Sequence, residues 1–255
     1  KIFILIIFEN KSTMFNISQR KAALVAGWSI LIMAILAGFA YGFVLQGLIV
    51  PENPTLTANN IKSSMMLFRL SIYSFLIILI CDILAAWGLH VFLKQVNEHF
   101  SLLTAWFRLV YSVILGTALL NFIFIVLLLN GENYLSVFEI SQINALVTFF
   151  LNAFHNIWSI GLIIFGCHLY MLGYLVLKSD YIPKIFGILL IIASLCYSIN
   201  HSANLLLHNY EKYKPTIELF ISLPMIIGEL GFGLWLLFKG GILSENENNS
   251  HGKKY

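Results

Sequence analysis

Residues 67–93 read LFRLSIYSFLIILICDILAAWGLHVFL, a continuous apolar stretch with few polar side chains. A helix rises about 1.5 Å per residue and needs about 20 apolar residues to cross the hydrocarbon core of a bilayer. A membrane-spanning β-strand would alternate apolar and polar residues over about ten positions, and this stretch does not alternate. The segment therefore predicts a transmembrane α-helix.

Five further stretches have the same character. The six predicted spans cover residues 22–50, 67–93, 102–130, 145–177, 185–207 and 217–238. Because only helices and closed barrels satisfy their backbone groups in lipid, the sequence predicts an all-α, polytopic transmembrane bundle of about six spans. The fourth stretch exceeds the required length, so we expect it to tilt, kink or project from the membrane.

The composition agrees with this class. Hydrophobic residues make up 59% of the 255 residues and charged residues 11%, with a mean hydropathy of +0.86. Soluble domains carry roughly 25% charged residues, so this chain has too few charged side chains to cover a water-facing surface. The 15 Lys and Arg barely exceed the 12 Asp and Glu. With no basic cluster carrying interleaved aromatics, the sequence gives no case for a nucleic-acid partner.

The basic residues of the loops predict the orientation. If the N-terminus is cytoplasmic, nine Lys and Arg fall on the inner side and three on the outer side. The inner set is Lys11, Arg20, Lys21, Lys94, Lys178, Lys184, Lys239, Lys253 and Lys254, and the outer set is Lys62, Lys212 and Lys214. The positive-inside rule therefore places both termini in the cytoplasm.

One domain accounts for most of the chain. We expect residues 14–243 to form a single six-helix transmembrane domain, with Met14 as the natural first residue and residues 1–13 as an upstream or non-native extension. The polar tail at 244–255 is expected to be disordered.

Four ionisable residues fall in one layer of the predicted inner half. Asp82, Arg108, His168 and Glu229 lie on four different spans, between about 10 and about 16 Å from the inner ends of their helices. Charges at membrane depth are costly and usually face the bundle interior. We interpret the four as a candidate ligand-binding cluster for an ion, a proton or a polar headgroup. The alternative is an ion-pair network that only fixes helix packing.

A second polar group falls in the outer half. Arg69, His155 and His201 form this secondary cluster, and hydrogen bonding between helices is the alternative interpretation for its histidines. On the first span, Ala34, Gly38 and Gly42 recur every four residues and predict a close approach of helices.

Motifs for metals, nucleotides and hydrolysis are missing. Asp82, His168 and Glu229 are legitimate metal-ligand types, but no HExxH or HxxxH spacing accompanies them, so we predict no metal and no cofactor. There is no GxSxG elbow and no P-loop. Without a recognisable catalytic motif, the sequence does not identify an enzyme.

Several segments of the chain form a recognisable set of motifs. The longest is HLYMLGYLVLKSDYIPKIFGILLIIASLCY at 168–197, and the others are RKAALVAG at 20–27, FRL at 68–70 and 107–109, and LWLLFKG at 234–240. Together they resemble an uncharacterised bacterial membrane family, the domain of unknown function 4386. The resemblance covers residues 20–240. It implies a bacterial cytoplasmic membrane protein and maps the family's motifs onto Arg69, Asp82, Arg108, His168 and Glu229, but it implies no established activity.

Three functions remain open on the sequence. The first is a multi-pass cell-membrane protein that binds or moves a small polar or lipid ligand at the inner-half cluster, with membrane lipids as its other partners. The second is a membrane-embedded lipid-modifying enzyme or hydrolase that uses the same cluster. The third is an accessory membrane subunit with no site of its own.

Overall fold

The computed structural model describes residues 18–131, 133–207 and 210–242. Its elements in chain order are α2 (Gln19–Ala37), η1 (Gly38–Leu45), α3 (Gln46–Leu48), α4 (Pro54–Ser63), α5 (Met65–Leu93), α6 (Glu98–Leu129), η2 (Asn133–Val137), α7 (Ile140–Lys178), α8 (Lys184–Leu206) and α9 (Tyr210–Phe238). No strand occurs in these ranges. The proposed extension at 1–13 and the tail at 244–255 lie outside the described residues.

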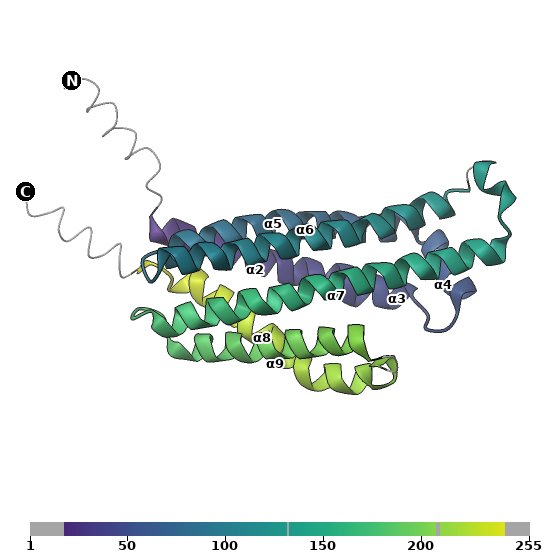
Figure 1. The fold of residues 1–255 in the computed structure, drawn as a ribbon. Coiled ribbons are helices and arrows are strands. Elements are labelled where there is room, and N and C mark those ends of the chain that lie inside the picture. Colours follow the sequence, from purple (N-terminus) through teal and green to yellow (C-terminus); the bar gives the residue numbers. More distant parts are fainter. Residues whose placement is uncertain (1–17, 132, 208–209, 243–255) are drawn as a thin grey trace, which may run out of the picture.

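The long helices form a closed ring. Each packs on the next in the order α2, α5, α6, α7, α8, α9, and α9 returns to α2. The beginnings of α2, α6 and α8 lie at the same end of the bundle as the ends of α5, α7 and α9 (Figure 1). We call this the basic end because it carries six described cations: Arg20, Lys21, Lys94, Lys178, Lys184 and Lys239. Which side of a membrane this end faces stays a prediction.

The helix lengths confirm a polytopic helical bundle. Five helices are long and apolar enough to cross a membrane, counting α2, η1 and α3 as one span over Gln19–Leu48. The predicted sixth span corresponds to α9, whose described apolar stretch is Ile226–Phe238. The overlong fourth span is the 39-residue α7, which extends beyond the α8–α9 hairpin toward the opposite end (Figure 1).

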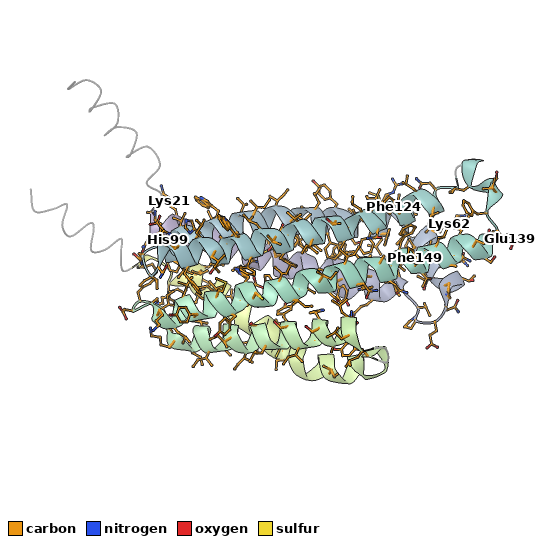
Figure 2. The ribbon with its side chains drawn as sticks, in the orientation of Figure 1. Lys21, Lys62, His99, Phe124, Glu139 and Phe149 are labelled. Atoms are coloured by element: carbon orange, nitrogen blue, oxygen red, sulfur yellow. The ribbon has the colours of Figure 1, made fainter. Side chains whose placement is uncertain are left out.

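Apolar side chains cover the outside of the bundle as well as its inside. Val113, Ile199 and Trp28 are among the large hydrophobic residues that are more than half exposed. Polar residues gather at the two ends: in Figure 2, Lys21 and His99 lie at the basic end, whereas Lys62 and Glu139 lie at the opposite end. This is the distribution that a lipid-facing surface between two aqueous layers requires.

The first span is not a regular α-helix throughout. Its middle section, η1, adopts π-helical geometry, which is rare and frequently found at functional sites. After the span ends, Asn53 caps the short helix α4 by accepting a bond from the Leu56 amide at 2.9 Å. Thr57 and Asn60 then tie α4 back to the backbone at Val50 and Leu48. The first predicted span ends at residue 50 and the second begins at 67, and no helix was predicted between them.

Close helix contacts occur at glycines other than the predicted ones. A Cβ added at Gly38 or Gly42 would meet nothing within 4 Å, so the prediction that these residues mediate close packing is wrong. At Gly88 of α5, by contrast, a Cβ would lie 2.8 Å from the Ala22 carbonyl oxygen. The difference lies in the direction that each glycine faces around its helix axis. Gly38 and Gly42 face open space, whereas Gly88 faces the backbone of α2.

The first and last helices are joined at the basic end by Arg20. Its guanidinium donates to the carbonyl oxygens of Leu236 at 3.0 Å, Leu237 at 2.6 Å and Gly240 at 2.8 Å. These carbonyls belong to the last turn of α9 and to the residues after it, where a helix leaves acceptors without internal partners. Arg20 therefore caps α9 from α2 and helps to close the ring.

Candidate functional site

Arg108 occupies the middle of the ring and is the largest side chain among the fully buried residues described. It lies on the inward face of α6, one turn after the buried Thr104. Its Nε donates to Asp82 Oδ1 of α5 at 2.9 Å, and its Nη2 donates to Glu229 Oε1 of α9 at 2.9 Å. One guanidinium thus joins three helices through two charge-assisted hydrogen bonds.

The imidazole of His168 completes the polar contacts of the guanidinium. Arg108 Nη1 lies 3.3 Å from His168 Nε2, and His168 Nδ1 lies 2.8 Å from the carbonyl oxygen of Thr104. A carbonyl oxygen can only accept and a guanidinium can only donate. His168 therefore carries its proton on Nδ1, accepts at Nε2, and is neutral in this arrangement.

Apolar and soft groups enclose the rest of the guanidinium. The ring of Phe165 lies with its centroid 5.3 Å from Arg108 Cζ, within the range of a cation–π contact. Met33 of α2 places its sulfur 3.8 Å from Nη2. Five helices of the ring, α2, α5, α6, α7 and α9, therefore contribute a side chain to this Arg108 centre.

The charges of the Arg108 centre do not balance. Two carboxylates face one guanidinium, and the neutral His168 adds no second positive charge. Asp82 Oδ2 is buried and has no hydrogen-bond partner among the described residues. The two acids also differ in exposure: the Asp82 side chain is 2% exposed, and that of Glu229 is 19% exposed.

The structure brings together all four residues of the predicted inner-half cluster. It separates the three residues of the outer one. Arg69 donates to Asn130 Oδ1 at 3.2 Å on the exposed surface, and it does not line the cavity that His155 and His201 share. In the described ranges, no group of three or more His, Cys, Asp or Glu residues is arranged to hold a metal ion.

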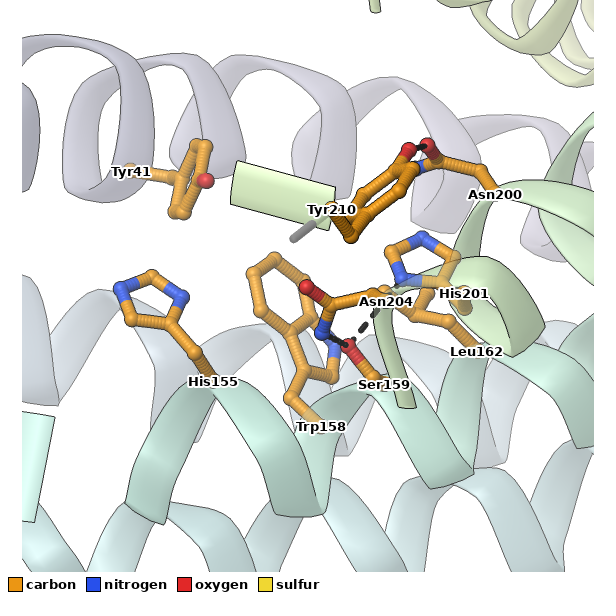
Figure 3. A pocket seen from close by; sticks show the side chains of 9 residues that line it. All are labelled: Tyr41, His155, Trp158, Ser159, Leu162, Asn200, His201, Asn204 and Tyr210. Atoms are coloured by element: carbon orange, nitrogen blue, oxygen red, sulfur yellow. Dashed lines mark hydrogen bonds between the residues drawn. The ribbon is translucent and has the colours of Figure 1, made fainter. Parts of the chain in front are cut away.

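The two histidines border a small polar cavity of about 30 Å³, which we call the outer cavity after the predicted position of these histidines (Figure 3). Side chains of η1, α7, α8 and α9 line it: Tyr41, His155, Trp158, Ser159, Leu162, Asn200, His201, Asn204 and Tyr210. Ser159 Oγ lies 3.2 Å from His201 Nδ1 and accepts from Asn204 at 3.0 Å, and Tyr210 donates to Asn200. The volume accommodates about one or two water molecules among these polar groups.

A hydrogen bond leads from this cavity toward the Arg108 centre. Trp158, which lines the cavity, donates from Nε1 to the hydroxyl of Tyr111 at 3.4 Å. Tyr111 lies three residues after Arg108 on the buried face of α6 and interacts electrostatically with Asp82 and Arg108. Four residues of these two sites were not predicted from the sequence: Met33, Tyr111, Trp158 and Phe165. Tyr111 could have been inferred, because it follows Arg108 by three residues and so lies on the same face of the helix.

Comparison with known proteins places the chain among proteins whose role is not assigned. A family described as a domain of unknown function, DUF4386, matches residues 25–240. An uncharacterized protein of Archaeoglobus fulgidus is 34% identical over 175 residues, which cover 69% of this chain and 86% of that protein. No solved structure matches the chain. Because this relative is archaeal, the bacterial origin implied by the resemblance stays a prediction.

Proposed function

Because the chain belongs to the DUF4386 family, whose function is unknown, we propose its function from the Arg108 centre alone. It is a binding or carrier protein of the cell membrane that takes up a proton or a small monovalent cation between Asp82 and Glu229. The observation that carries the proposal is the excess carboxylate, together with the unpartnered Asp82 Oδ2.

The physical reason is the cost of an uncompensated charge. Arg108 balances one carboxylate, and the second leaves a net negative charge beside the fully buried Asp82 and Arg108. Such a charge at membrane depth costs several kcal/mol unless it is neutralised. His168 cannot supply the missing positive charge because Nε2 accepts from Arg108. A proton or a small cation from outside the bundle is the remaining source.

Two features support access to the centre. Glu229 is the more exposed of the two acids, so we place the route of an ion on its side of the centre. On the other side, Tyr111 and Trp158 extend the polar contacts to the outer cavity. Among the described residues, the titratable groups that act electrostatically on the two carboxylates also include Cys81, Tyr111 and Tyr197.

The test is to remove one carboxylate without changing its shape. Glu229→Gln leaves Arg108 and Asp82 as a balanced pair, so the centre no longer needs an added proton or cation. We expect the thermal stability of the parent in detergent to respond to Na⁺ or K⁺ against choline, or to decrease as pH rises because a bound proton is released. The Glu229→Gln variant should remain folded and lose that response.

The matched control is Glu52→Gln, the same chemical change at an exposed loop residue. It should respond to pH and to cations like the parent. If Glu229→Gln also responds like the parent, or if the parent responds to neither pH nor cations, the Arg108 centre only holds the helices together and the proposed function is wrong.

A further inference from the structure

A second cavity lies at the basic end, apart from the Arg108 centre. It has a volume of about 470 Å³ and is bordered by the start of α2, the α5–α6 connection, the α7–α8 turn and the end of α9. Its polar lining includes Gln19, Gln95, Lys178, Asp180 and Lys239, with Trp235 among the remaining residues. The volume is within the usual range of small-molecule sites. We call this cavity the basic cup.

Two helix C-termini converge on the basic cup, and each would by itself repel an anion. The ends of α7 and α9 carry partial negative charge on their last carbonyl oxygens. Cations of the chain already neutralise both ends. Arg20 donates to three carbonyls around the end of α9, and Lys184 Nζ donates to Leu177 O at 2.7 Å and to Ser179 O at the end of α7.

Lys178 and Lys239 are therefore not needed as caps. Both are exposed, and within the described part of the chain the only ion pairs within 4.0 Å are those of Arg108. Lys178 contacts the ring of Tyr174 at 5.7 Å, which leaves its ammonium donors available. Two lysines, one at the last residue of α7 and one just after α9, thus border one cavity, and no described carboxylate is paired to either.

The charge around the basic cup is positive. The six described cations of the basic end outnumber its described carboxylates, Glu98 and Asp180. Tyr181 adds no negative charge, because burial raises the pKa of its phenol and its hydroxyl donates to Phe92 O at 3.1 Å. The indole of Trp235, half-buried among Phe186 and Phe232, lies where tryptophans are enriched, at a boundary between lipid and water.

We propose that the basic cup binds a phosphate group, with Lys178 and Lys239 paired to its oxygens and the amides of Gln19 and Gln95 as further donors. Lysine is a common phosphate ligand that acts as a point charge. The cavity is larger than a bare phosphate, so the ligand carries a headgroup or another small polar substituent. Two sources share this chemistry: the headgroup of an anionic phospholipid, and a soluble phosphate ester. The inference is independent of the proton- or cation-binding role proposed above.

The experiment measures binding to the purified full chain after its lipids have been exchanged for detergent. Phosphatidylglycerol, phosphatidylcholine and soluble glycerol phosphate are added in separate titrations, followed by native mass spectrometry and by thermal stability. We expect binding of phosphatidylglycerol or of glycerol phosphate, and little of phosphatidylcholine. A charged hydrogen bond is worth about 1.5 kcal/mol or more, so Lys178→Gln and Lys239→Gln should each weaken binding about tenfold.

The control for charge alone is Lys62→Gln, an exposed lysine at the opposite end, which should bind like the parent. The double variant Lys178→Arg, Lys239→Arg keeps both charges and should retain binding, which separates lost charge from lost structure. Binding of phosphatidylglycerol alone assigns the lipid source, and binding of glycerol phosphate assigns the soluble one. Binding of neither, or an affinity that Lys178→Gln and Lys239→Gln leave unchanged, would overturn the proposal.

Discussion

Arg108→Met should be among the most destabilising single substitutions in this bundle. It removes the hydrogen bonds from the guanidinium to Asp82 and Glu229, both at 2.9 Å, and the contact to His168 at 3.3 Å. Asp82, with a side chain only 2% exposed, is then left with both oxygens unpartnered. Breaking one side of a buried pair typically costs about 3–5 kcal/mol, and we expect a loss in that range.

Replacing Asp82 should destabilise the protein less than Arg108→Met does. Adding the Asp82 replacement to Arg108→Met should restore part of the stability that Arg108→Met loses. Asp82→Leu leaves Arg108 and Glu229 as a balanced pair, so it should cost clearly less than Arg108→Met. The double variant leaves only Glu229, which at 19% exposed is less buried than Asp82, and it should recover at least half of the Arg108→Met loss.

Reversible unfolding in mixed micelles measures all three variants as a double-mutant cycle. The reasoning would be refuted if Asp82→Leu costs as much as Arg108→Met. It would also be refuted if the double variant loses the sum of the two single losses, because the pair would then carry no coupling energy.

Three further changes test the packing, the ring closure and the topology. Gly88→Ala should cost about 1–3 kcal/mol of unfolding free energy, because its Cβ would meet a backbone oxygen at 2.8 Å, whereas Gly116→Ala, with its nearest neighbour at 3.6 Å, should be tolerated in the same assay. Arg20→Gln should lower the free energy of unfolding by about 1–3 kcal/mol, because it removes the cap on the end of α9. Amide hydrogen exchange in this variant should be faster at the end of α9 than in α6. In a background without native cysteines, a cysteine replacing Glu52 should react with an impermeant thiol reagent from outside intact cells and one replacing Asp180 should not; the reverse pattern would invert the predicted orientation.

The spans and the inner-half layer could be predicted from the sequence because both depend on distance along a helix. Apolar length identifies a span, and counting residues from its inner end gives depth. That count placed Asp82, Arg108, His168 and Glu229 at one level, and their cost in lipid required them to face inward. Matched depth and the cost of facing lipid were together enough to predict that the four side chains converge.

What could not be predicted depends on rotation around the helix axis and on local backbone geometry. Arg69 shares the outer half with His155 and His201, yet it faces outward and bonds to Asn130. The π-helical section η1 has no residue signature in the sequence, and it carries Tyr41 into the outer cavity. The charge imbalance around Arg108 was visible in the sequence, but the neutral state of His168 needed the position of Thr104 O.

The Arg20 cap has a consequence for how the protein is made. Its carbonyl partners follow it by 216 to 220 residues in the chain, so the first helix emerges from the ribosome long before they exist. During synthesis the guanidinium must remain solvated at the membrane surface until the last helix has been inserted. Release of a truncated chain would leave that arginine without acceptors and would leave the ring open along the face of α2 that α9 covers. Membrane quality-control proteases can recognise an exposed helix face of this kind.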